Sequence, residues 1–166
     1  MPRPLGQATS FALSADRLFV GTGDSATVDV YSLTGERLRT LRLDVPVRAP
    51  TRAQYEAAAG VFLSIVPSQV REAARTWILG VPIPERLPPY TALLTDDGGL
   101  LWVVLSVPGD PTTRLRAIRE NGTVVADVTV PVNLSVFEVG ADYILGARED
   151  ENGEPHLMVF RLRRGG

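Results

Sequence analysis

Residues 91–130 restrict the possible folds more than any other part of the chain, because four short apolar runs alternate there with three turn signals. The first turn is the sequence DDGG at 96–99, in which Asp side chains accept backbone N–H groups and Gly supplies a positive φ. The second is the PGDP loop at 108–111, and the third is Asn121-Gly122, a strong hairpin signal. We therefore predict one antiparallel sheet of four strands.

The second of these strands, at 100–105, is apolar on both alternating sets of side chains. A strand with that pattern is covered on both of its faces. The last strand, at 124–130, mixes Val with Asp127 and Thr129 and fits the outer edge of the sheet. The sheet is thus expected to lie between two other sheets.

The same order of strands and turns recurs twice, at 8–43 and at 134–164. Leu18-Phe19-Val20 aligns with Leu101-Trp102-Val103, Tyr31 aligns with Ile118, and Gly35 aligns with Gly122. Self-similarity at about 40 residues is typical of propellers and solenoids. We predict an all-β fold in one domain, 1–166, with about three four-stranded antiparallel β-propeller blades. The blades are expected at 8–43, 90–130 and 134–164, the last without its outer strand, after a loose lead-in at 1–7.

Residues 44–89, between the first two blades, are expected to form a small α-helical insert. The sequence TRAQ at 51–54 is a capping box, which predicts a helix over 55–59 that ends at Gly60. Ser68 is expected to cap a second helix over 69–79. Four prolines then favour an extended approach to the second blade.

The connectivity of a four-stranded blade puts this insert on the same face as the loops at 23–26, 108–112 and 149–155. By analogy of fold, this face of a propeller is usually the one that holds ligands. The candidate ligand-binding residues come from these loops and from the insert: Asp24, Asp110, Glu149, Asp150, Tyr55 and Trp77. For Tyr55 and Trp77, packing of the insert onto the blades is favoured over a ligand platform.

The residues from Thr95 to Trp102 fit the Asp-box pattern S/T-x-D-x-G-x-x-W. In such a box the Asp accepts backbone N–H groups within its own hairpin and the aromatic residue packs between blades. Asp97, Gly99 and Trp102 are therefore expected to have a structural role.

Composition restricts the chemistry further. The net charge of −2 gives no reason to expect nucleic acid, and the absence of Cys removes thiolate chemistry and Cys-based metal sites. The single His156 has no second His and no nucleophile motif near it. The oxygen-rich sequence EDENGE at 149–154 lacks the ligand spacing of an EF-hand and fits a solvated turn better than a cation site. We expect no catalytic residues, metal or cofactor.

No apolar run reaches the ~18 residues of a membrane span, and no secretory core follows the first residues. We therefore expect a soluble chain without membrane contact. The sequence predicts no compartment, and export of a longer parent protein stays open.

Four short motifs resemble the C-terminal half of bacterial six-bladed β-propeller proteins related to the NHL-repeat group. They are VYSLTG at 30–35, PIP at 82–84 with PPY at 88–90, DDGGLLWV at 96–103 and ILG at 144–146. The resemblance implies a complete ring of about twice this length.

Three functions follow as hypotheses. The leading one is a non-enzymatic binding scaffold of unknown ligand. The first alternative is a hydrolase or lyase with a metal or carboxylate site at the channel mouth. The second is a half-propeller that acts only after two copies close a six-bladed ring, with 8–13 of one copy, or the residues before them, pairing with 157–163 of the other.

Overall fold

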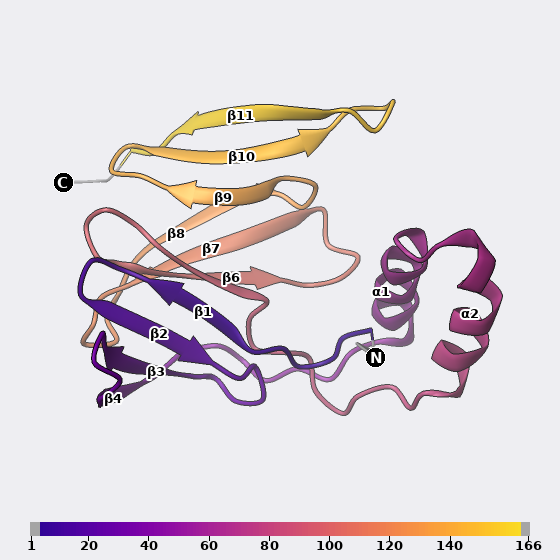
Figure 1. Ribbon diagram of the computed structural model, residues 1–166, viewed down its shortest axis with the longest axis horizontal. Helices are drawn as coiled ribbons and strands as arrows, with labels where there is room; N and C mark the ends of the chain where they lie inside the picture. Colours follow the sequence, from indigo (N-terminus) through magenta and orange to yellow (C-terminus); the bar gives the residue numbers. More distant parts are fainter. Residues whose placement is uncertain (1–3, 164–166) are drawn as a thin grey trace.

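The computed structural model describes residues 4–163, which form three antiparallel sheets and two helices (Figure 1). Sheet one contains β1 Ser10–Leu13, β2 Arg17–Gly21, β3 Thr27–Ser32 and β4 Arg37–Arg42. Sheet two contains β5 Ala92–Thr95, β6 Leu101–Ser106, β7 Thr112–Ile118 and β8 Val124–Pro131. Sheet three contains β9 Ser135–Val139, β10 Tyr143–Glu149 and β11 Pro155–Arg161.

Each strand pairs with the next strand along the chain, so all three sheets are simple meanders. The described residues confirm the predicted antiparallel β-sheets, two of four strands and one of three, and the chain is mostly β because the insert adds two helices. Residues 1–3 of the expected lead-in and residue 164 of the expected third blade lie outside the described residues.

The last two strands of sheet one and of sheet two are joined by hairpin turns of the same kind. Gly35 in the β3–β4 turn has a φ of +87° and Gly122 in the β7–β8 turn has a φ of +89°. Each glycine N–H donates to a carbonyl three residues earlier, on Ser32 at 3.0 Å and Arg119 at 2.8 Å. A residue with a Cβ would be strained in this left-handed conformation, which is why glycine marks both turns.

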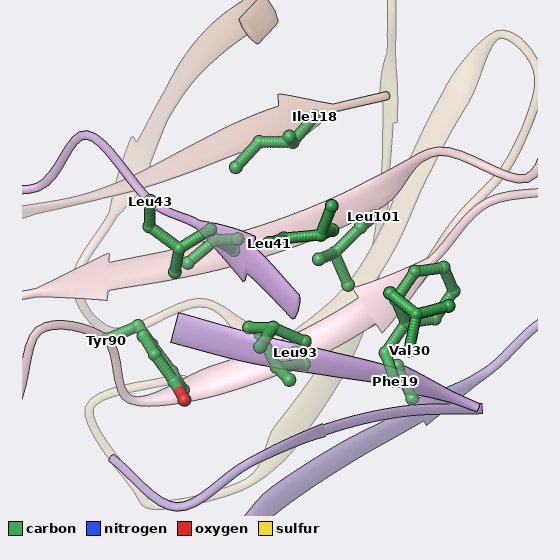
Figure 2. Packing of buried hydrophobic residues seen from close by; sticks show 11 residues of the cluster. Phe19, Val30, Leu41, Leu43, Tyr90, Leu93, Leu101 and Ile118 are labelled. Carbon is green, nitrogen blue, oxygen red and sulfur yellow. The ribbon is translucent and has the colours of Figure 1, made fainter. Parts of the chain in front are cut away.

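Side chains pack between the sheets in two apolar layers. Between sheets one and two, buried side chains of β2, β3 and β4 meet those of β5 and β6 (Figure 2): Phe19, Val30, Leu41, Leu93 and Leu101. Between sheets two and three, Trp102, Leu115, Val139 and Ile144 belong to a second buried cluster. Sheet two is therefore covered on both faces, as its second strand predicts. Burial of each such side chain contributes about 1.5–3 kcal/mol of transfer free energy.

The first strands of the three sheets are neighbours. Thr95 Oγ1 at the end of β5 donates to the carbonyl of Leu13 at the end of β1 at 2.7 Å. The next residue, Asp96, forms an isolated parallel bridge with Val139 at the end of β9. The sheets therefore follow one another in chain order, with β1, β5 and β9 side by side.

The insert contains α1 Arg52–Ser64, a 3-10 turn at Ser68–Val70 and α2 Arg71–Gly80. The predicted capping box is present, because Gln54 N–H donates to Thr51 Oγ1 at 3.2 Å and Thr51 N–H donates to Gln54 Oε1 at 2.9 Å.

Two predictions for the insert are wrong. Helix α1 continues through Gly60 to Ser64, because a glycine inside a helix costs only about 1 kcal/mol relative to Ala and does not by itself end it. Ser68 does not cap α2, because it lies in the 3-10 turn, and the N-cap position is Val70, which makes no side-chain cap bond.

The helices stand beyond one end of the sheets, on the same side as the β2–β3, β6–β7 and β10–β11 loops (Figure 1). Two extended segments, 44–51 and 81–91, connect them to the sheets; we call these the limbs of the insert. The backbone N–H of Leu87 donates to the carbonyl of Arg48 at 2.8 Å, which ties one limb to the other. The insert therefore lies at the end of the sheets that carries the β2–β3, β6–β7 and β10–β11 loops (Figure 1).

Candidate functional site

A cavity of about 180 Å³ opens between sheet two and the limbs of the insert. Its floor comes from β7, where Arg114 pairs with Thr129 and Arg116 pairs with Asp127 of β8. Since side chains two residues apart point to the same face of a strand, both arginines project from the face that is turned toward sheet one. The limbs supply the opposite wall, which includes Arg48 and Leu87. We call this space the arginine cavity.

Arg116 is held by a carboxylate in its own sheet. Its Nε donates to Asp127 Oδ1 at 2.9 Å and one terminal nitrogen donates to Asp127 Oδ2 at 3.0 Å, which is a bidentate pair. The other terminal nitrogen donates to the carbonyl of Asp44 at 2.7 Å. The hydrogen bonds with Asp127 raise the pKa of Arg116 above its usual value. Arg116 therefore anchors the first limb to sheet two and has its charge compensated.

Arg48 and Arg114 differ from Arg116 in this respect. Among residues 4–163, neither side chain has a hydrogen-bond or ion-pair partner, although both line the cavity. Asp110 in the β6–β7 loop is the one carboxylate among the lining residues. The cavity therefore presents two uncompensated guanidinium groups and one carboxylate.

Hydroxyl groups and apolar side chains complete the lining. Thr112 and Thr129 supply two hydroxyls. Ser106 also belongs to the lining, but its Oγ accepts from Thr113 Oγ1 at 3.4 Å on the other face of sheet two, away from Arg114. The apolar part of the wall comes from both limbs and the end of β6: Val45, Pro46, Leu87, Pro88, Pro89 and Leu105. The arrangement suits a small molecule with a charged head and an apolar body.

The sequence-based site residues are not brought together. Asp110 lines the arginine cavity, whereas Asp24, Glu149, Asp150, Tyr55 and Trp77 do not. Asp24 and Asp150 lie in separate loops, between β2 and β3 and between β10 and β11.

The two loop aspartates are engaged within their own turns. Hydrogen bonds from the hydroxyls of Thr22 and then Ser25 hold the pKa of Asp24 below its usual value. Asp150 Oδ1 accepts the backbone N–H groups of Glu154 at 2.9 Å and Asn152 at 2.8 Å. The bond from Glu154, followed by that from His156, lowers the pKa of Asp150. Both aspartates thus stabilise hairpin loops.

Tyr55, one of the two aromatic candidates on the insert, serves the packing of the insert itself. Tyr55 of α1 is buried and its hydroxyl donates to the carbonyl of Ile78 in α2 at 3.0 Å. Trp77 on α2 is half-buried. Tyr55 therefore joins helix to helix, rather than the insert to a blade as we expected.

The turn between β5 and β6 corrects one residue of the Asp-box prediction. Asp96 is buried, and its Oδ1 accepts the N–H of Leu100 at 2.9 Å while its Oδ2 accepts the indole N–H of Trp102 at 3.0 Å. The neighbouring Asp97, to which we assigned this role, is exposed. Gly99 has a φ of +78° and Trp102 is buried between sheets two and three.

Among the described residues, one group of three acidic or His side chains brings its ligand atoms within 4.8 Å of one another: Asp150, Glu154 and His156. All three are exposed at the tip of the β10–β11 hairpin. The enzyme hypothesis places a metal or carboxylate site at the channel mouth of a propeller, in which the first strands would line the channel. Strands β1, β5 and β9, all of them described, carry a single carboxylate, Glu138. Glu138 accepts a hydrogen bond from the Tyr143 hydroxyl, and this bond raises the pKa of Tyr143.

None of the three cavity arginines is among the site residues predicted from the sequence. The alternation of Arg114, Leu115 and Arg116 does signal two arginines on one strand face. Nothing local to Arg48 signals that the limb carries it to the same place.

A comparison with protein-family models found no match, and a comparison with curated proteins found none either. The resemblance to six-bladed propellers therefore stays a prediction. No helix of the described part of the chain is long and apolar enough to cross a membrane.

Proposed function

We propose that this chain is a non-enzymatic binding scaffold, built as half of a β-propeller, with its ligand face at the end covered by the insert. The observation that carries the proposal is the arginine cavity, which opens at that end between sheet two and the limbs. It contains unpaired donors and an apolar wall, and it includes one residue, Asp110, of the face that the sequence indicates.

The propeller arrangement is supported by three features of the sheets. They are meanders in chain order, they pack face to face, and their first strands lie next to one another. In a propeller the first strand of each blade lines the central channel, and the loops between second and third strands gather at one end.

A fragment screen by NMR tests the binding face. Chemical-shift changes in a ¹⁵N-labelled sample, recorded against about a hundred diverse small fragments, are expected to cluster on 45–48, 87–89 and 105–116. Changes that cluster at the opposite end of the sheets, or none with any fragment, would contradict the proposal.

We also propose that two copies associate through their open sheet faces. The outer face of sheet one exposes Phe11, which is 71% accessible, together with Leu13. The outer face of sheet three exposes Leu157 and Val159, at 74% and 69%. Two apolar sheet faces are thus open at opposite ends of the stack, and such surfaces mark interaction sites.

The internal repeat supports a second copy as the partner. Phe19 of β2 faces sheet two, and Trp102, its aligned residue in β6, faces sheet three. The next aligned residue is Leu145 of β10, which shares a face with Val159 on the open side of sheet three. Conversely, Leu101 and Ile144 face the preceding sheet, and their aligned residue Leu18 lies on the open side of sheet one.

In sheets one and two, the face that corresponds to the open face of sheet three packs against the next sheet along the chain. Sheet one of a second copy offers the matching surface. The association differs from the edge pairing of 8–13 that we expected from the sequence, because residues 10–13 are already strand β1 and the apolar surface is on the sheet faces.

Light scattering on a sizing column tests the association. Wild-type protein is expected at twice 18.0 kDa, and Leu157→Glu is expected to give a monomer because its charge would be buried without a partner. Leu79→Glu is the matched control, since Leu79 is 76% exposed on the insert and far from both faces along the chain. A wild-type monomer, or equal masses for both variants, would overturn the proposal.

A further inference from the structure

We propose that the arginine cavity selects small organic carboxylates, with the carboxylate held between Arg48 and Arg114. This inference rests on the proposed binding function and adds the chemical class of the ligand. Arg48 comes from the limb and Arg114 from the floor, so the two cations belong to opposite walls of one cavity.

The charge of the lining favours a single negative charge. Of the three lining arginines, Arg116 is compensated by its bidentate pair with Asp127. The remaining two positive charges of Arg48 and Arg114 face one negative charge on Asp110, which leaves a net charge of +1. A carboxylate neutralises this excess, whereas a phosphate dianion would exceed it. Guanidinium groups also match the planar geometry of a carboxylate.

The two guanidinium groups are uncommitted, and the backbone that carries them is held in place. Neither arginine side chain has a partner among the described residues, so ligand binding breaks no internal ion pair. The limb that carries Arg48 is held at two points, by the bond from Leu87 N–H to the Arg48 carbonyl and by that from Arg116 to the Asp44 carbonyl. The held backbone lowers the entropy that binding must lose, so that only the two arginine side chains become ordered with the ligand.

The rest of the cavity suits an apolar body. Pro88, Pro89 and Leu105 form an apolar wall, and Thr129, which pairs with Arg114, adds a hydroxyl to the lining. The volume of about 180 Å³ is smaller than a typical drug-sized pocket, so the ligand is a small molecule.

Three probes with the same phenyl body and different head groups test the preference for a carboxylate. Phenylacetate is the monoanion, phenylacetamide is its neutral analogue, and phenyl phosphate is the dianion. Each is titrated at pH 7 into ¹⁵N-labelled protein, and the shift changes give the site and the Kd. Phenylacetate is expected to bind in the millimolar range and about tenfold more tightly than phenylacetamide.

Variants identify the site. Arg114→Gln and Arg48→Gln are each expected to weaken phenylacetate binding about fivefold or more, since each removes a charge-assisted donor. Both side chains are exposed and unpaired, so neither change disturbs the fold. Arg75→Gln removes an exposed arginine of α2 outside the cavity and is expected to leave the Kd within about twofold.

Equal binding of phenylacetamide, tighter binding of phenyl phosphate, or a Kd unchanged in both cavity variants would overturn the inference. A phenylacetate Kd above about 10 mM would overturn it too. Neutral fragments that still bind at the insert end would leave the proposed scaffold function in place, so the two failures are distinguishable.

Discussion

Asp96→Asn removes one of the two acceptors that hold the β5–β6 turn against Trp102. Asp96 is 6% exposed, and its two carboxylate oxygens accept hydrogen bonds from Leu100 N–H and from the indole N–H of Trp102. An Asn side chain has one carbonyl oxygen, so one of these donors must face the NH₂ group instead. A lost hydrogen bond to a charged group costs about 1.5–3 kcal/mol, and the buried donor left unsatisfied adds to this.

We therefore expect Asp96→Asn to lower the free energy of unfolding by about 2–4 kcal/mol. With a urea m-value of about 2 kcal/mol/M, the midpoint falls by about 1–2 M. Asp97→Asn makes the same chemical change one residue away on an exposed side chain, and it is expected to stay within about 0.5 kcal/mol.

Urea unfolding followed by tryptophan fluorescence and circular dichroism measures both variants. In a Trp102→Phe background the indole donor is gone, so Asp96→Asn is expected to cost less there than in the wild type. Equal midpoints for the two Asn variants, or a larger loss at Asp97, would refute the assignment of Asp96 as the structural aspartate.

Three further predictions concern single positions. Gly21→Ala would place a Cβ 1.9 Å from the hydroxyl oxygen of Tyr90, so we expect a loss of about 1–3 kcal/mol in urea unfolding, and an unchanged midpoint would contradict this close contact. Gly60→Ala meets nothing within 4 Å inside α1 and is expected to stabilise the chain by about 0.5–1 kcal/mol; a loss of stability would show that the helix ends there. The carboxyl of Asp150 is expected to titrate below 3.8 by NMR, and His156→Gln should move its midpoint upward. Because the folded pKa is depressed, this stabilisation is present above pH 3.8 and is lost as the pH falls through the folded value, so a midpoint at or above 3.8 would rule it out.

The strands were predictable because their signals are local. Gly35 and Gly122 mark turns that need a positive φ, and the apolar runs between turns have strand length. Gly60 misled the prediction because no such conformation is required there, and a helix held by its capping box and by Tyr55 tolerates the glycine.

The site was harder to predict because it depends on contacts between distant parts of the chain. Which of Asp96 and Asp97 turns inward is decided by where the indole of Trp102 lies, and not by the composition of the turn. Arg48 and Arg114 share a cavity only because the limbs fold back over sheet two. No periodic pattern in the sequence indicates that the limbs lie over sheet two.

The bond between Leu87 N–H and the Arg48 carbonyl affects which sequence changes the chain can accept during evolution. The bond joins the two limbs at the base of the insert, so the two helices lie in a closed loop. The length of this loop can change without moving the points at which the limbs meet the sheets. Doubling the length of a closed flexible loop costs only about 0.6 kcal/mol. Substitutions or insertions in the two helices can therefore be tolerated while the stack of three sheets and the floor of the cavity persist.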